Sequence, residues 1–194
     1  MDGYCTIENS EYFPDTMTTN TCFSQLALYN QWMNGKLYDA AAVLPEEELR
    51  RDRGAFFGSV FGTLNHIAIG DILWFKRIAR YLPDLASLQC VEQLPPPGFP
   101  NTPLRDTLAE LAGLRAMLDE AIIAFCAEVT PARLGEAFEW TSTRGIPSRK
   151  VLGDVLLHVF NHQTHHRGQA TTLFSQIGID VGATDLLLLL PDAP

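Results

Sequence analysis

Apolar residues recur at three- and four-residue steps along much of the chain, which is the spacing of one face of an α-helix. The first such stretch covers residues 23–44, with Thr21 as its expected N-cap and Pro45 at its end. The second covers about residues 55–82 and is stopped by Pro83. Both patterns predict long helices with one buried face.

Residues 93–103 contain five prolines in eleven positions. Proline lacks an amide hydrogen and fixes φ, so no helix crosses this stretch, and we interpret it as a long connection. A third apolar repeat predicts a helix over 103–128, capped by Thr102. A fourth predicts a helix over 148–177, with Gly178 as the residue that ends it.

Residues 136–149 carry the strand-like pattern of the chain. Phe138 and Trp140 alternate with polar neighbours, and 143–145 has the composition of a turn. Pro147 restricts the second arm to a sheet edge. These features predict a small β-hairpin between the third and fourth long helices.

Together these elements predict an all-α protein, a four-helix bundle with one small hairpin. We expect a single domain over 1–194, with an irregular N-terminal segment over 1–19 and a short final helix after Thr184.

The composition narrows the function classes. Lys and Arg number 14 against 23 Asp and Glu, which gives a net charge of −9. That balance argues against nonspecific nucleic-acid binding and against docking on an anionic membrane. The longest uninterrupted leucine run, 186–190, is far shorter than the roughly 20 residues of a membrane span.

The cysteines and the first residues indicate a compartment. Four cysteines lie far apart and form no CxxC pair: Cys5, Cys22, Cys90 and Cys126. This is neither a disulfide framework nor a zinc ribbon, and reduced thiols fit better. Because the polar N-terminus has no apolar signal-peptide core, we expect a cytoplasmic protein.

Four of the five histidines fall within nine residues of the fourth predicted helix. With His162 at zero, His158 lies at about −40°, His166 at about +40° and His165 at about −60°. Histidines four residues apart can reach one metal ion, so the pairs 158/162 and 162/166 both qualify, and 162/165 is a third option. His162 belongs to every pair. The competing interpretation is a solvated polar face with one hydrogen-bonded core histidine.

The fifth histidine, His66, lies midway along the second predicted helix. Small neighbours, Gly62, Thr63 and Gly70, would leave space above its imidazole. Asp71 lies about 140° around the helix from His66, so we expect it to form a core hydrogen bond rather than share a metal with His66. Taken alone, His66 has the pattern of a buried structural histidine.

Several stretches resemble the DinB family of four-helix-bundle proteins. Residues 158–178, HVFNHQTHHRGQATTLFSQIG, resemble its fourth-helix motif, and residues 50–74, which contain TLNHIAIGD, resemble its second. The first helix of the family resembles residues 28–41, and its C-terminal segment resembles residues 184–191. The resemblance covers nearly the whole chain from about residue 20.

The resemblance implies one divalent metal ion held by three histidines. His66 comes from the NH motif, and His162 and His166 come from the HxxxHRGQ motif. His165 would lie outside the ligand set, and His158 would have a surface or supporting role. Imidazole suits zinc, nickel and iron alike.

A metal ion held by three histidines would be able to bind a substrate as well. Three neutral imidazoles leave coordination positions open, as in catalytic rather than structural sites. The family includes thiol S-transferases or isomerases that use a low-molecular-weight thiol, and metal-dependent hydrolases. The resemblance therefore implies an enzyme acting on a small molecule, and a homodimer, which the terminal leucines also favour. The alternatives are a non-catalytic metal- or small-molecule-binding bundle in a stress response, and a structural dimer with a vestigial site.

Weaker candidates surround this site. Gln169, at about −20° on the histidine face, could hydrogen-bond a ligand or a metal-binding histidine. Arg167, at about +140°, is expected to pair with a carboxylate. Trp140 could cover the open end of the bundle. Three residues of the first helix could face the site or pack in the core: Tyr29, Asn30 and Trp32.

Overall fold

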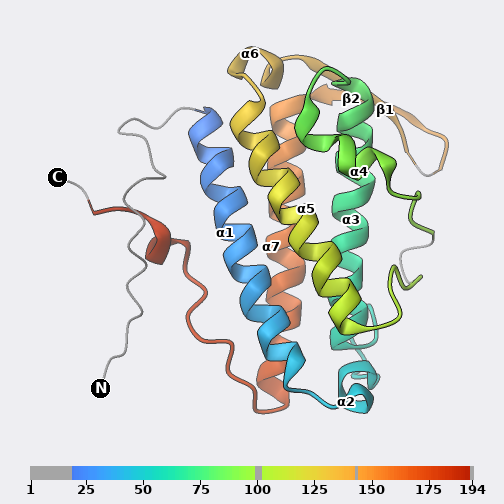
Figure 1. Cartoon of the computed structure of the whole chain (residues 1–194), viewed down its shortest axis with the longest axis vertical. Helices are drawn as coiled ribbons and strands as arrows, with labels where there is room; N and C mark the ends of the chain where they lie inside the picture. Colours follow the sequence, from blue (N-terminus) through green and yellow to red (C-terminus); the bar gives the residue numbers. More distant parts are fainter. Residues whose placement is uncertain (1–18, 99–101, 143, 193–194) are drawn as a thin grey trace.

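Four long helices form the bundle in the computed structural model, which describes residues 19–98, 102–142 and 144–192 (Figure 1). They are α1 (Thr19–Ala42), α3 (Val60–Tyr81), α5 (Leu108–Glu128) and α7 (Leu152–Gln176). In Figure 1, α1 and α7 run downward, whereas α3 and α5 run upward. Each long helix therefore packs against antiparallel and parallel neighbours around one core, and the predicted bundle is confirmed.

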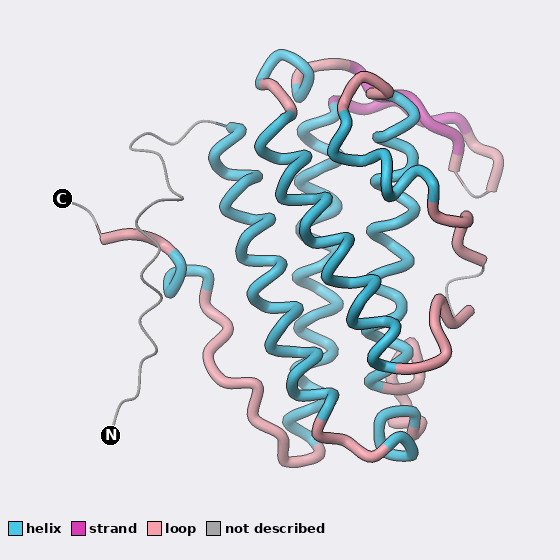
Figure 2. The backbone as a smooth tube through the Cα atoms, in the orientation of Figure 1, coloured by secondary structure: helices cyan, strands magenta, loops and turns pink. Residues whose placement is uncertain are grey.

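The hairpin lies where it was predicted, between α5 and α7 (Figure 2). Strand β1 (Ala137–Thr141) pairs antiparallel with β2 (Pro147–Val151), and Trp140 lies opposite Ser148. Thr143 of the predicted turn lies outside the described residues, as does the expected irregular segment up to residue 18. The helix expected after Thr184 is the single turn η2 (Leu186–Leu189).

Several short elements connect the long ones and were not predicted. They are α2 (Glu46–Arg50), η1 (Ala86–Leu88), α4 (Gln89–Gln93) and α6 (Pro131–Leu134). Their lengths of three to five residues are too short to give an apolar repeat. The helix α4 ends where the proline run begins, as the missing amide hydrogens require.

The start of α1 differs from the prediction. The helix begins at Thr19, so Thr21 lies inside its first turn and is buried. Threonine can cap a helix or pack within one, and the apolar repeat cannot distinguish the two.

The predicted start of α3 at residue 55 is also wrong, because the backbone turns sharply before Val60. Gly54 and Gly58 have φ of 67° and 74°, a left-handed conformation that interrupts a helix. Ser59 then caps α3, and its hydroxyl oxygen accepts a hydrogen bond from the Gly62 amide at 3.0 Å.

The start of α5 moves from the predicted Pro103 to Leu108. Thr107 and Glu110 form a reciprocal capping box, so Thr107, and not Thr102, is the N-cap. Residues 102–104 are held by Asn65 of α3. Its amide group donates to the Thr102 carbonyl at 3.0 Å and accepts from the Leu104 amide at 2.8 Å.

The fourth long helix begins four residues later than predicted and ends close to where it was expected. Residues 148–151 belong to β2, so α7 starts at Leu152. At the other end the Ile179 amide donates to the Phe174 carbonyl at 3.0 Å, and Gly178 has φ of 78°. This is a Schellman motif, which confirms Gly178 as the residue that ends the helix.

Aromatic side chains join the helices in the core. Phe75 of α3 meets Phe125 of α5 edge to face at 5.8 Å, and Phe23 of α1 stacks on Phe160 of α7 at 6.1 Å. Within the described residues, no helix combines the length and the apolar character that crossing a membrane requires.

Candidate metal centre

Three histidines from two helices converge between α3 and α7. The candidate ligand atoms of His66, His162 and His166 all lie within 4.8 Å of one another. Two nitrogens bound to one tetrahedral zinc ion are about 3.4 Å apart, so two atoms at the 4.8 Å limit would each move by about 0.7 Å to complete such a site. His166 is buried, and His66 and His162 are partly buried. The rings therefore face one another rather than solvent.

Gly70 permits this close approach of α7 to α3. A Cβ atom at position 70 would lie 2.7 Å from Cε1 of His162, well inside van der Waals contact. The sequence suggested that small residues would leave space above His66. The structure gives the space at Gly70 to His162 instead, because His162 packs across the backbone of α3 one turn beyond His66.

Gly62 serves a different neighbour. A Cβ atom there would lie 2.1 Å from the backbone oxygen of Phe57, so Gly62 lets the loop before α3 fold back onto the helix. The ring of Phe57 then stacks on His66 at 3.7 Å and meets His166 edge-on at 5.3 Å. Sequence reasoning missed Phe57. The one available signal was an aromatic pair between two turn-forming glycines, Gly54 and Gly58.

Gln169 orients His166. The Nδ1–H group of His166 donates to Oε1 of Gln169 at 2.8 Å, which leaves Nε2 of His166 as the nitrogen with a free lone pair. The predicted role of Gln169 as a hydrogen-bond partner of this cluster is confirmed. The Gln169 amide also donates to Nε2 of His165 at 3.2 Å. His165 is exposed and lies outside the converging group, as expected.

Burial keeps the imidazoles neutral. Desolvation and, to a lesser extent, the neighbouring His166 lower the pKa of His162 to about 4. Desolvation also lowers the pKa of His166. Nδ1 of His162 is buried without a hydrogen-bond partner among the described residues. Neutral rings with an uncommitted buried nitrogen are the donor set that a divalent metal ion requires.

His158 and Trp140 lie beyond the cluster. His158 is exposed, and its ring meets Trp74 edge-on at 5.4 Å, 6.2 Å from the ring of His162. Trp140 stacks on Phe138 at 5.2 Å and meets Trp74 at 5.4 Å. Trp140 thus packs the hairpin onto α3, consistent with a covering role at that end of the bundle.

Asp71 accepts hydrogen bonds in the core, as expected from its angle on α3, and it also belongs to an ion pair. Its carboxylate accepts hydrogen bonds from Arg115 and, at 2.6 Å, from the amide of Gln163. Arg115 also lies 3.0 Å from Asp119, and all three charged residues are almost fully buried. Because Gln163 adjoins His162 in sequence, this ion pair also anchors the turn of α7 that carries His162.

Arg167 departs from its prediction, because it pairs with an amide and not with a carboxylate. It donates to Oδ1 of Asn30 and to the Thr164 hydroxyl, the latter at 3.1 Å. The amide of Asn30 donates in turn to Asp119 at 3.3 Å. Asp119 is already beside Arg115, so Asn30 bridges the second arginine to the same carboxylate.

The first-helix candidates pack away from the histidines. Asn30 belongs to the buried network just described. The Tyr29 hydroxyl donates to the Thr184 carbonyl at 2.7 Å, and Lys36 lies over the ring of Trp32 at 4.5 Å. The core-packing alternative therefore holds for Asn30, whereas Tyr29 and Trp32 are only partly buried and contact Thr184 and Lys36.

A helical bundle with three converging histidines defines a class of protein that could hold a divalent metal ion between two of its helices. The sequence matches the DinB family over residues 17–192, and the chain belongs to that family. It is similar to "Protein DinB" of Bacillus subtilis (strain 168), with 26% identity over 163 residues, which is 84% of this chain and 90% of the relative. No solved structure matches the chain.

Proposed function

We propose that His66, His162 and His166 bind one divalent metal ion, and that the protein is a metal-dependent enzyme acting on a small molecule. The observation that carries this proposal is the convergence of three imidazoles from two helices. In the part of the chain that the structure describes, this group contains no carboxylate or thiol. A three-ligand set leaves positions for a substrate, as in catalytic sites.

A divalent ion held there supplies Lewis acidity, which acidifies a thiol or water molecule and polarises a carbonyl group. Because the three protein donors are neutral, the charge of the ion is not offset by its ligands. An anionic substrate group, such as a thiolate, would therefore be attracted. This charge balance supports a thiol S-transferase, with a low-molecular-weight thiol as one substrate, or a hydrolase.

The surrounding residues support the same assignment. Gln169 holds the proton on Nδ1 of His166 and so fixes its tautomer. Gly70 makes room for His162, and Phe57 covers one face of His66 and excludes water from it. We propose that the ion is zinc, nickel or iron, because imidazole suits each of them. A cytoplasmic homodimer is part of the proposal, and exposed Leu187 and Leu188 are candidates for its contact.

One observation favours a second function, a metal-binding bundle without catalysis. Phe57 stacks directly on His66, and a ring in that place limits access from the side of the loop before α3. If the loop does not open, the bundle would bind metal or a small molecule without turnover.

Metal analysis of untagged protein tests the proposal, followed by assays with several small thiols and an electrophile. We expect about one divalent ion per chain and thiol-dependent consumption of the electrophile. His165→Ala should retain the ion and serves as the control variant, because His165 is exposed and lies outside the three-histidine group. Metal content near one per chain without any turnover would support the second function, and no retained metal would contradict both.

A further inference from the structure

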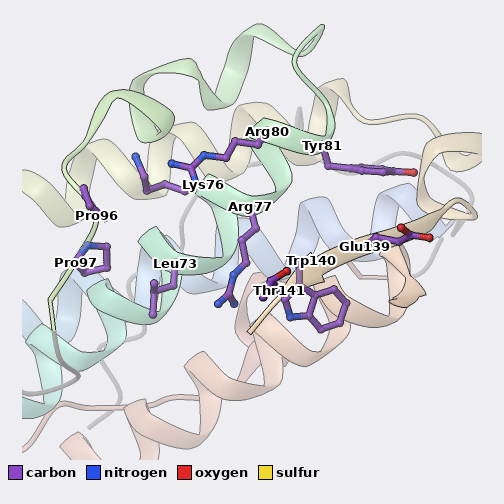
Figure 3. Close-up of a pocket in the computed structure, with 10 residues that line it drawn as sticks. All are labelled: Leu73, Lys76, Arg77, Arg80, Tyr81, Pro96, Pro97, Glu139, Trp140 and Thr141. Carbon is purple, nitrogen blue, oxygen red and sulfur yellow. The ribbon is translucent and has the colours of Figure 1, made fainter. Parts of the chain in front are cut away.

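A second candidate site lies on α3, away from the histidines. A cavity of about 560 Å³ opens between the C-terminal half of α3, the Pro96–Pro97 connection and strand β1 (Figure 3). Its volume falls in the range of small-molecule pockets. Arg77, which lines it, is seven residues beyond Gly70, or about 10 Å along the helix axis. None of His66, His162 and His166 is among the residues that line the cavity.

Positive charge gathers in this cavity although the chain is acidic. Three of the 14 basic residues line it, namely Lys76, Arg77 and Arg80. Two of these three side chains already interact with other groups of the protein. The ammonium group of Lys76 donates to backbone carbonyls at the C-terminal end of α4, including that of Val91 at 3.4 Å. Arg80 pairs with Glu92 at 3.0 Å.

Arg77 is the uncommitted cation. Its guanidinium lies 4.9 Å from the ring of Trp74, and it has no hydrogen bond or ion pair among the described residues. It is partly buried, and desolvation lowers its pKa. Glu139, the acid that lines the cavity, is paired with Arg149 at 3.0 Å across the hairpin. A partly desolvated guanidinium without an anion gains free energy when an anion enters.

Apolar side chains form part of the cavity wall near Arg77, namely Leu73, Pro97 and Trp140. In Figure 3 the Arg77 side chain extends between Leu73 and Thr141, and the indole of Trp140 lies beyond Thr141. Pro97 closes the side opposite the hairpin. A ligand that pairs with Arg77 would therefore place the rest of its body against Leu73, Pro97 and Trp140.

We propose that this cavity binds a small organic carboxylate, whose carboxyl group pairs with Arg77 and whose apolar body packs against Leu73, Pro97 and Trp140. The planar guanidinium matches a carboxylate through two parallel hydrogen bonds. One uncommitted cation balances a monoanion, and for that reason a carboxylate fits better than a dianionic phosphate ester. The inference does not depend on metal binding.

Calorimetric titration with benzoate tests the proposal, with benzamide as its neutral isostere and phenyl phosphate as the dianion. We expect benzoate to bind the wild-type protein at least about tenfold more tightly than benzamide, because the charged group meets Arg77. Phenyl phosphate is expected to bind more weakly than benzoate. Benzoate binding should weaken with added salt, because part of the attraction is electrostatic.

Arg77→Gln is expected to weaken benzoate binding about tenfold or more, whereas Arg80→Gln, in the same cavity but already paired, should change it less than about threefold. Trp140→Leu gives a second test through the apolar wall and should also weaken binding. His66→Ala should bind benzoate as the wild type does, which separates this cavity from the metal proposal. Equal binding of benzoate and benzamide, or unchanged benzoate binding in Arg77→Gln, would overturn the proposal. Tighter binding of phenyl phosphate would overturn the carboxylate assignment.

Discussion

Gly70→Ala probes the packing that brings His162 to the cluster. The added methyl carbon would lie 2.7 Å from Cε1 of His162, whereas ordinary contact begins at 3.4 Å, so the ring must move by about 0.7 Å. Metal–nitrogen distances tolerate only about 0.2 Å. The fold itself should survive, because the clash is with a side chain and alanine favours a helix over glycine by up to about 1 kcal/mol. We therefore expect a folded protein with a damaged site.

The expected loss is about 10- to 100-fold in metal affinity, the range seen when groups that support metal ligands are changed. This corresponds to about 1.4–2.7 kcal/mol. Competition with a chromophoric chelator measures the affinity, and a thermal melt checks folding. Gly168→Ala is the matched control, because Gly168 lies exposed on α7 with no atom within 4 Å of an added Cβ, and its metal affinity should not change. Wild-type affinity in Gly70→Ala would refute the reasoning.

Three further predictions concern other parts of the molecule. Gln169→Ala should weaken metal binding about 10- to 100-fold in the same chelator competition, because the Nδ1–H of His166 loses its acceptor; an unchanged affinity would show that Gln169 does not orient that ring. Arg115→Ala leaves two buried carboxylates without their partner and should cost about 3–5 kcal/mol in urea unfolding. Arg149→Ala, which breaks an exposed pair, should cost less than about 1 kcal/mol, and similar costs for the two variants would contradict the buried network. Burial raises the pKa of Cys126 to about 12, so its thiol stays protonated near neutral pH. Iodoacetamide should therefore label exposed Cys90 before Cys126, as mass spectrometry would show, and equal labelling of these two thiols in the folded protein would contradict the burial of Cys126.

The sequence predicts the helices better than their starting points. Periodicity identifies the four long helices, since each must bury one face. It extends past the true starts because apolar residues continue into loops and strands. The start of α3 depends on left-handed backbone at Gly54 and Gly58, which the repeat does not reveal. The start of α5 was recognisable in principle, because Thr107 and Glu110 have the spacing of a capping box.

The candidate site, like the fold, is predicted only in part from the sequence. Helical spacing offered His162 and His166 as one of three possible pairs, and the resemblance selected it. His66 was predicted as a metal ligand only from the family resemblance, because the packing of α3 against α7 is tertiary structure that local sequence does not reveal. Phe57 came from neither source, since the fold of the loop before α3 alone brings its ring to His66. Contacts made across elements, such as Asn30 bridging Arg167 to Asp119, have no local sequence signal.

X-ray absorption spectroscopy of zinc-loaded protein tests the central claim most directly, because it counts imidazoles around the ion. For the wild type, the proposed site predicts three imidazole nitrogens at about 2.0–2.1 Å and no sulfur. The His66→Ala variant should have two imidazoles or bind zinc too weakly to measure, whereas His165→Ala should match the wild type. An unchanged spectrum in His66→Ala, or a lost imidazole in His165→Ala, would contradict the three-histidine site.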